Sequence, residues 1–153
     1  VYGVSPALAG AMREAWQAAP AGRTGIGTTL SASPLQLAAL RATLAEVITD
    51  EACARMVALA TRLADALRQV FARHGLDWCV TQLGARCEIQ CTDTPPRTAR
   101  EAEAAAQPAV TQLLHLYLLN RGLLLTPFHD MMLTSPATSL DAVIALADAV
   151  DAC

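Results

Sequence analysis

An amphipathic helix predicted between Thr49 and Gly75 constrains the fold of this chain more than any other feature. Asp50 and Glu51 suit the positive N-terminal end of such a helix, and Gly75 suits a left-handed residue at its C-terminus. Apolar residues recur along one side at Met56, Leu59, Leu63, Leu67, Val70 and Phe71. Because an apolar stripe must be buried against another element, this helix needs a partner layer.

The residues after Gly75 are the candidates for that layer, because their pattern changes from helical spacing to period two. Residues 78–81 are β-prone, and Gly84 predicts a tight turn after them. Polar Arg86, Glu88 and Gln90 then alternate with Cys87, Ile89 and Cys91. This alternation is typical of a half-buried strand, so two strands are predicted, at 78–81 and 86–91.

Two helix starts precede this region. Ser5 can cap a helix over residues 5–19, with Pro6 in its first turn. Ser33 can cap a second helix that runs to about Val47, with Pro34 at its first position and Gln36 completing a capping box. Residues 23–32 between them are small, polar and rich in glycine, and they predict a loop.

The last third of the chain shows the same signals. Thr98 and Glu101 form a capping box before an Ala-rich helix that Pro108 splits, and the second part ends near residue 121. Residues 122–127 and 131–134 are predicted as short strands. Thr138 and Asp141 form a third capping box before a final helix. Val143, Ile144, Ala147 and Val150 are the residues expected to face inward on that helix.

This order of elements predicts an α+β fold, with a short antiparallel sheet covered on one face by helices. The chain has 153 residues, about one domain, and is 54% hydrophobic and 16% charged, so a packed core is expected. The formal net charge of −3 argues against nucleic acid or an anionic membrane as a partner. A cytoplasmic location is expected, because neither a signal segment nor a membrane-spanning run is recognisable.

Lysine is absent from the sequence, and all 11 basic residues are arginine. These residues therefore contain no amine side chain that could react covalently with a carbonyl group.

The best candidate for a binding site is the stretch from residue 25 to residue 34. Its glycines allow close approach of a ligand to the backbone, its Thr and Ser residues carry hydroxyls, and a helix N-terminus follows. These are the components of a phosphate cradle. An ordinary Gly/Thr loop followed by a capped helix has the same residues, so that reading stays open.

Other polar residues are weaker candidates. The five cysteines lack paired metal-ligand spacing and are expected to be reduced thiols. A zinc site built on Cys87, Cys91 and His115 is a minor alternative. His129 and Asp130 could form an acid–base pair, although adjacent residues rarely point at one target.

Four segments, in collinear order, resemble class III aminotransferases, with glutamate-1-semialdehyde aminomutases the most similar members. They are residues 2–5, 27–35 (Gly-Thr-Thr-Leu-Ser-Ala-Ser-Pro-Leu), 41–47 and 117–138 (Tyr-Leu-Leu-Asn-Arg-Gly-Leu-Leu-Leu-Thr-Pro-Phe-His, then Met-Leu-Thr-Ser-Pro-Ala-Thr from Met132). The resemblance implies a pyridoxal 5'-phosphate (PLP) enzyme of fold type I that works as a homodimer on a small amine or amino-acid substrate.

The resemblance also implies roles for particular residues. Thr29, with Thr28 as the alternative register and Gly27 beside them, would contact the PLP phosphate of the partner subunit. The cofactor lysine would lie just upstream of Tyr2. Many class III members carry an arginine in the last strands that binds the substrate α-carboxylate, and residues 129–136 here contain none.

The resemblance further implies a division of the chain into three parts. Residues 1–34 would be the tail of the large domain, residues 35–48 a connecting helix, and residues 49–153 the small C-terminal domain. Helices that normally pack on a large domain would expose apolar side chains here. Leu8, Met12, Trp16, Leu37 and Leu40 are the residues expected to be exposed in this way.

Three functional hypotheses follow. The first is the C-terminal part of a PLP-dependent aminotransferase or aminomutase, inactive without the rest of the enzyme. The second is a truncated or degenerate small domain that serves only as a dimer or ligand-binding module. The third is a small ligand-sensing module unrelated to PLP enzymes, which the collinear resemblance disfavours.

Overall fold

The computed structural model describes residues 3–20, 33–125 and 130–153. The chain forms two compact units, residues 1–42 and residues 43–153. The first unit contains helices α1 (Pro6–Ala18) and α2 (Pro34–Ala42). Ser5 caps α1 as predicted, since its hydroxyl accepts a hydrogen bond of 3.3 Å from the Leu8 N–H. Neither helix contains a buried residue.

The second unit begins with the π-helical segment η1 (Thr43–Val47) and the long helix α3 (Asp50–His74). The hairpin β1 (Cys79–Leu83) and β2 (Arg86–Gln90) follows, and then the helices α4 (Ala99–Ala105) and α5 (Pro108–Leu119). The unit ends with the strand β3 (Met131–Leu133) and the helix α6 (Leu140–Asp151). Its described residues therefore have the predicted α+β class.

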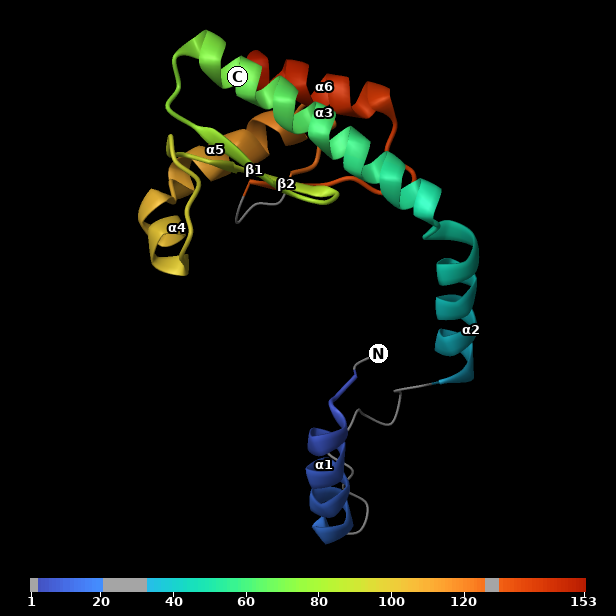
Figure 1. The fold of residues 1–153 in the computed structure, drawn as a ribbon. Coiled ribbons are helices and arrows are strands. Elements are labelled where there is room, and N and C mark those ends of the chain that lie inside the picture. Colours follow the sequence, from blue (N-terminus) through green and yellow to red (C-terminus); the bar gives the residue numbers. More distant parts are fainter. Residues whose placement is uncertain (1–2, 21–32, 126–129) are drawn as a thin grey trace. The chain divides into compact units, whose positions relative to one another are not determined.

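The sheet of the second unit is antiparallel and has the order β1-β2-β3. The helix α3 packs on β1 and β2 and lies beside α6, which also contacts α5 (Figure 1). Two side chains join the C-terminal ends of α3 and α6, because Arg73 and His74 contact the Asp151 carboxylate at 2.8 and 2.9 Å.

The hydrophobic core lies between the stripe of α3 and one face of the sheet. Leu63, Leu67 and Phe71 of α3 are almost fully buried, and the Phe71 ring meets Trp78 edge-on at a centroid distance of 5.4 Å. The sheet contributes Val80, Cys87, Ile89 and Met132, and further core residues are Leu118, Leu125, Val143, Ala147 and Val150. The predicted amphipathic helix is thus the element on which this core is built.

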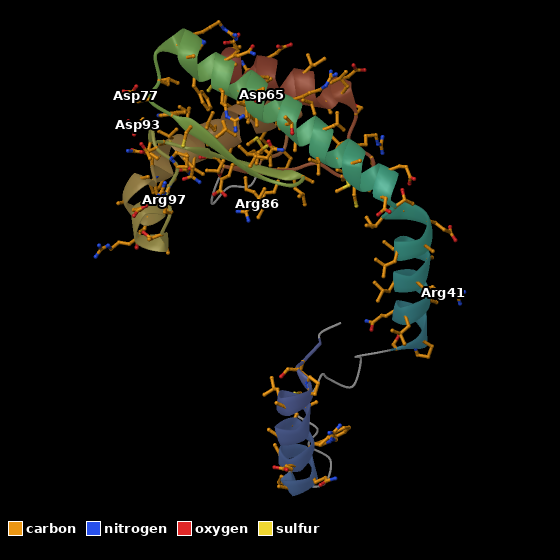
Figure 2. The ribbon with its side chains drawn as sticks, in the orientation of Figure 1. Arg41, Asp65, Asp77, Arg86, Asp93 and Arg97 are labelled. Atoms are coloured by element: carbon orange, nitrogen blue, oxygen red, sulfur yellow. The ribbon has the colours of Figure 1, made fainter. Side chains whose placement is uncertain are left out.

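The opposite face of the sheet is open at one end among the described residues, whereas Thr81, Glu88 and Gln90 on the same face are partly buried. Leu83, Arg86 and Leu133 lie side by side across the three strands in the observed register. Leu83 is 85% exposed and Leu133 is 66% exposed. Arg86 extends from the sheet on the side away from α3 (Figure 2) and pairs with Glu88 on its own strand at 2.7 Å.

Three sequence predictions for the last third of the chain were wrong in part. Residues 122–125 form no strand, because Leu125 enters the core and its neighbours pair with no other strand; residues 126 and 127 lie outside the described residues. Ser139, not Thr138, caps the final helix and accepts from the Ala142 N–H at 3.1 Å. Ile144 is half exposed, whereas the other predicted inward residues of α6 are buried.

The sequence prediction for the helix after Ser33 was right in its start and incomplete in its course. Ser33 accepts a hydrogen bond from the Gln36 N–H, but α-helical geometry ends at Ala42 and a π-helical segment continues to Val47.

Among the described residues, no helix is both long and apolar enough to cross a membrane.

Replacement of Leu67 by alanine tests the central position of α3. Leu67 is fully buried, so Leu67→Ala should lower the free energy of unfolding by about 2–5 kcal/mol. Leu83→Ala is the matched control on the open face and should change it by less than about 0.5 kcal/mol. Denaturant unfolding measures both, and equal effects of the two changes would contradict this assignment of the core.

Candidate functional site

The candidate phosphate-contacting residues Gly27, Thr28 and Thr29 lie outside the residues that the structure describes. The flank that it does describe is Ser33 and the start of α2. The Ser33 hydroxyl accepts from the Gln36 N–H at 3.4 Å, and the Leu37 N–H donates to the Ser33 carbonyl at 3.0 Å. Ser33 therefore begins a true helix N-terminus. Pro34 has no N–H and the Gln36 N–H is taken by the cap, so the helix dipole is the main feature of this flank that favours an anion.

This flank fits the phosphate of PLP but not its aldehyde. Hydroxyls and backbone N–H groups near a helix start are suitable donors to a dianion. The aldehyde needs an amine, and the sequence contains no lysine. Within these 153 residues, the chemistry of the donors is thus that of a phosphate contact rather than of covalent cofactor attachment.

A second polar cluster lies between α5 and the start of β3. The Thr111 hydroxyl donates a hydrogen bond of 2.9 Å to Oδ2 of Asp130, a residue that is only 5% exposed. Nδ1 of His115 lies 2.6 Å from the Leu125 carbonyl oxygen. Because a carbonyl only accepts, Nδ1 must carry the proton in this contact. Thr111 and His115 are four residues apart, so one face of α5 holds both Leu125 and Asp130.

The predicted acid–base pair of His129 and Asp130 is described only in part, because His129 lies outside the described residues. Asp130 takes part in the sheet through its backbone, since its carbonyl accepts from the Ile89 N–H at 3.1 Å. Its carboxylate turns toward α5, where it meets Thr111. The sequence analysis did not identify Thr111 as a site residue. The feature that could have indicated it is its spacing of four residues from His115, which places both on one face of a helix.

An apolar groove of about 450 Å³ runs beside β3. Its walls come from residues 123–125, from β3 and from α3 and α6, and Thr134 and Thr138 are its polar members. The sequence left open whether the Met131–Leu133 run packs the core or forms an apolar lining. All three residues line this groove, and Met132 is in addition buried in the core, whereas Leu133 is largely exposed.

The five cysteines are all free thiols. Burial raises the pKa of the Cys87 thiol to about 11. Burial, with a smaller contribution from the Asp130 carboxylate, raises the pKa of Cys91 to about 11 as well. No three His, Cys, Asp or Glu side chains converge on a possible metal position within the described part of the chain, and the ring of His115 contacts a backbone carbonyl instead.

Comparison with family models and with curated proteins found no match. Solved structures do match. A glutamate-1-semialdehyde aminomutase from Pseudomonas aeruginosa PAO1, in complex with PMP, is 41% identical with a TM-score of 0.90. The similarity covers 99% of this chain and 34% of that chain. The chain therefore spans about a third of the length of that relative.

More distant structures share the fold. An omega-transaminase from Sphaerobacter thermophilus has a TM-score of 0.69 at 23% identity, over 88% of this chain and 29% of its own. A β-phenylalanine aminotransferase from Variovorax paradoxus has the same TM-score and identity, over 77% of this chain and 27% of its own.

The fold is that of the C-terminal small domain of fold type I PLP enzymes, together with helices that precede it. The chain belongs to the class III PLP-dependent aminotransferase family and is similar to glutamate-1-semialdehyde aminomutase. The resemblance found in the sequence is thereby confirmed.

Replacement of Thr111 by valine tests the polar cluster at α5. Thr111→Val keeps the shape of the side chain but removes the donor to a buried carboxylate, so it should lower the free energy of unfolding by about 1–3 kcal/mol. Thr94→Val is the matched control, because Thr94 also contacts an aspartate, Asp93, but is exposed. The control should stay within about 0.5 kcal/mol in denaturant unfolding. If Thr111→Val changes the free energy of unfolding as little as the control does, the hydrogen bond between Thr111 and Asp130 does not stabilise the fold.

The raised pKa values of the Cys87 and Cys91 thiols predict a pH-dependent reactivity. A thiol of pKa about 11 is only about 0.1% thiolate at pH 8, and this fraction rises roughly tenfold for each pH unit up to the pKa. Brief iodoacetamide treatment at pH 8, read by peptide mass spectrometry, should therefore modify exposed Cys53 and leave Cys87 and Cys91 intact. Modification of all three at the same rate would contradict the shielding of Cys87 and Cys91 from solvent.

Proposed function

We propose that this chain forms the C-terminal part of a cytoplasmic, homodimeric PLP-dependent aminotransferase or aminomutase that moves an amino group on a small amino acid or amino aldehyde. One observation carries the proposal: 41% identity and a TM-score of 0.90, over 99% of the chain, with an aminomutase bound to PMP. When bound, PLP supplies the electron sink that makes bonds at the amine carbon labile.

The contribution of this chain to the cofactor site is phosphate binding. Thr29, or Thr28 in the alternative register, would donate its hydroxyl to the phosphate of the partner subunit's PLP, with Gly27 allowing close approach. The capped start of α2 supports this role, because the partial positive charge of its helix dipole lies four residues after Thr29 in the sequence.

The proposal assigns the cofactor lysine to a part of the enzyme outside these 153 residues, since none of them is lysine. It also divides the chain as the family resemblance implies, with residues 1–34 in the large domain, residues 35–48 connecting, and residues 49–153 in the small domain. Exposed apolar side chains support this division. Leu8, Trp16, Leu37 and Leu40 are all exposed in a unit whose helices bury nothing, whereas Met12 is partly covered.

The proposed substrate class follows from the absence of arginine between residues 129 and 136. An α-amino acid bound through a bidentate arginine in this stretch is therefore disfavoured. Thr134 does not replace it, because its hydroxyl is engaged with the backbone carbonyls of Met56 and Ala85 at 2.8 and 3.2 Å. The sequence is more consistent with a substrate that needs no arginine for an α-carboxylate, such as an amino aldehyde, a β-amino acid or another amine.

The alternative function is a non-catalytic domain of the same family that serves as a dimer or ligand-binding module. The absence of lysine is the observation that favours it. The two functions differ in whether the protein forms a covalent PLP adduct.

Borohydride reduction in the presence of PLP tests the proposed function. The protein that carries this chain should gain the mass of one reduced PLP per subunit, and peptide mapping should place the adduct outside residues 1–153. Thr29→Ala should weaken PLP binding by roughly ten- to a hundred-fold, because a hydrogen bond to a charged group is worth about 1.5–3 kcal/mol.

Exposed Thr94 supplies the control, since Thr94→Ala should leave PLP binding unchanged. If the protein forms no adduct and binds no PLP, the non-catalytic alternative replaces the proposal. If it forms the adduct but Thr29→Ala and Thr28→Ala both bind PLP normally, the enzyme assignment stands and the phosphate contact is wrong.

A further inference from the structure

The strand β1 is an edge of the sheet, because the order β1-β2-β3 gives it a neighbouring strand on one side only among the described residues. Val80 of β1 lies opposite Ile89, and the Ile89 N–H donates away from β1, to the Asp130 carbonyl at 3.1 Å. Val80 and Ile89 therefore exchange no hydrogen bonds, and the N–H and C=O of Val80 point away from β2. Because the two kinds of pair alternate, the backbone groups of Gln82 point to the same free edge.

Side chains of α3 occupy this edge. The Arg68 guanidinium donates through Nη2 to the Val80 carbonyl at 2.8 Å, and its Nη1 contacts Oδ1 of Asp65 at 2.8 Å. Seven residues earlier on the helix, the Thr61 hydroxyl accepts a hydrogen bond of 2.9 Å from the side-chain amide of Gln82. Residues seven apart lie on the same side of a helix, so one polar row of α3 follows the free edge of β1.

This row has the features that proteins use to close a strand edge. Unpaired N–H and C=O groups of an edge can pair with a strand of another chain, and a covering helix or a charged side chain prevents this pairing. Arg68 supplies the charge, occupies the Val80 carbonyl that an added strand would need, and is oriented by Asp65. Since α3 and β1 both belong to the second unit, these contacts are made without the rest of the enzyme.

We propose that the free edge of β1 is a pairing surface for a second copy of this chain, and that Arg68 keeps this surface closed. Antiparallel pairing of two copies about Thr81 is self-complementary, as a two-fold interface requires. It places Val80 of one copy opposite Gln82 of the other, and the backbone groups of both residues face the edge. The inference goes beyond the proposed function, because neither PLP nor a substrate takes part in it.

Replacement of Arg68 by alanine opens the edge. In the protein that carries this chain, Arg68→Ala should raise the association constant for species larger than the parent assembly by about ten-fold or more. A second strand then no longer has to displace a hydrogen bond from a charged donor. Sedimentation velocity over a range of concentrations measures the association. Arg62→Ala is the matched control, since Arg62 is also an exposed arginine of α3, and its loss should leave the assembly unchanged.

A second change identifies the surface that pairs. Gln82→Pro in the Arg68→Ala protein removes an N–H that faces the free edge, so it should restore the parent assembly. If this double variant does not fold, hydrogen exchange on the Arg68→Ala protein decides the question. The amides of residues 79–83 should exchange more slowly in the associated species than in the parent protein, because the added strand protects them.

Four results would overturn the proposal. They are an unchanged assembly of Arg68→Ala, equal association of Arg62→Ala, continued association of a folded double variant, and unchanged exchange of residues 79–83. The first would also be the result if another part of the enzyme covered β1. Because none of these measurements uses PLP, the closed edge and the proposed function can fail separately.

Discussion

The burial of one stripe of α3 against the sheet is the interaction on which the second unit depends. Leu63, Leu67 and Phe71 occupy the space between the helix and β1 and β2, and α6 closes the same core from beside α3. Removal of this apolar area from water is the dominant favourable term in folding. The hairpin, β3 and α6 hold their positions because each contributes side chains to this one core.

The polar residues near β3 are arranged around the core rather than within it. Asp130 is buried at the margin, where Thr111 meets its carboxylate, and His115 fixes the backbone at Leu125. A buried carboxylate is costly unless hydrogen bonds compensate for the loss of water. One face of α5 therefore sets the position of Leu125 and of the first residues of β3, and with it the apolar groove between them. The opposite face of the sheet is exposed at one end among the described residues, where Leu83 and Leu133 project from it.

Prediction from sequence succeeded where the signal was local. Gly75 at the end of α3, with φ of 65°, and the caps at Ser5, Thr49 and Thr98 lie where the sequence placed them, because each depends on neighbours within three or four residues. It failed where distant contacts decided the outcome. Leu125 was expected in a strand, but it enters the core and its backbone carbonyl meets His115. Thr138 was expected as a cap, but its hydroxyl accepts from the Ser135 N–H at 2.8 Å, and Ser139 takes its place. The roles of Thr28 and Thr29 remain predictions, since the structure does not describe them.

The sequence by itself determined the class of fold, the family and the absence of lysine within these residues. Periodicity, caps and collinear motifs are local properties, and the absence of lysine is a property of composition. Only the tertiary structure decided that Thr111 meets Asp130, that Met132 is core while Leu133 is exposed, and that the helix after Ser33 becomes π-helical at Thr43. These outcomes depend on groups that are distant in sequence or on the balance between backbone geometry and packing, and neither can be read from the order of residues.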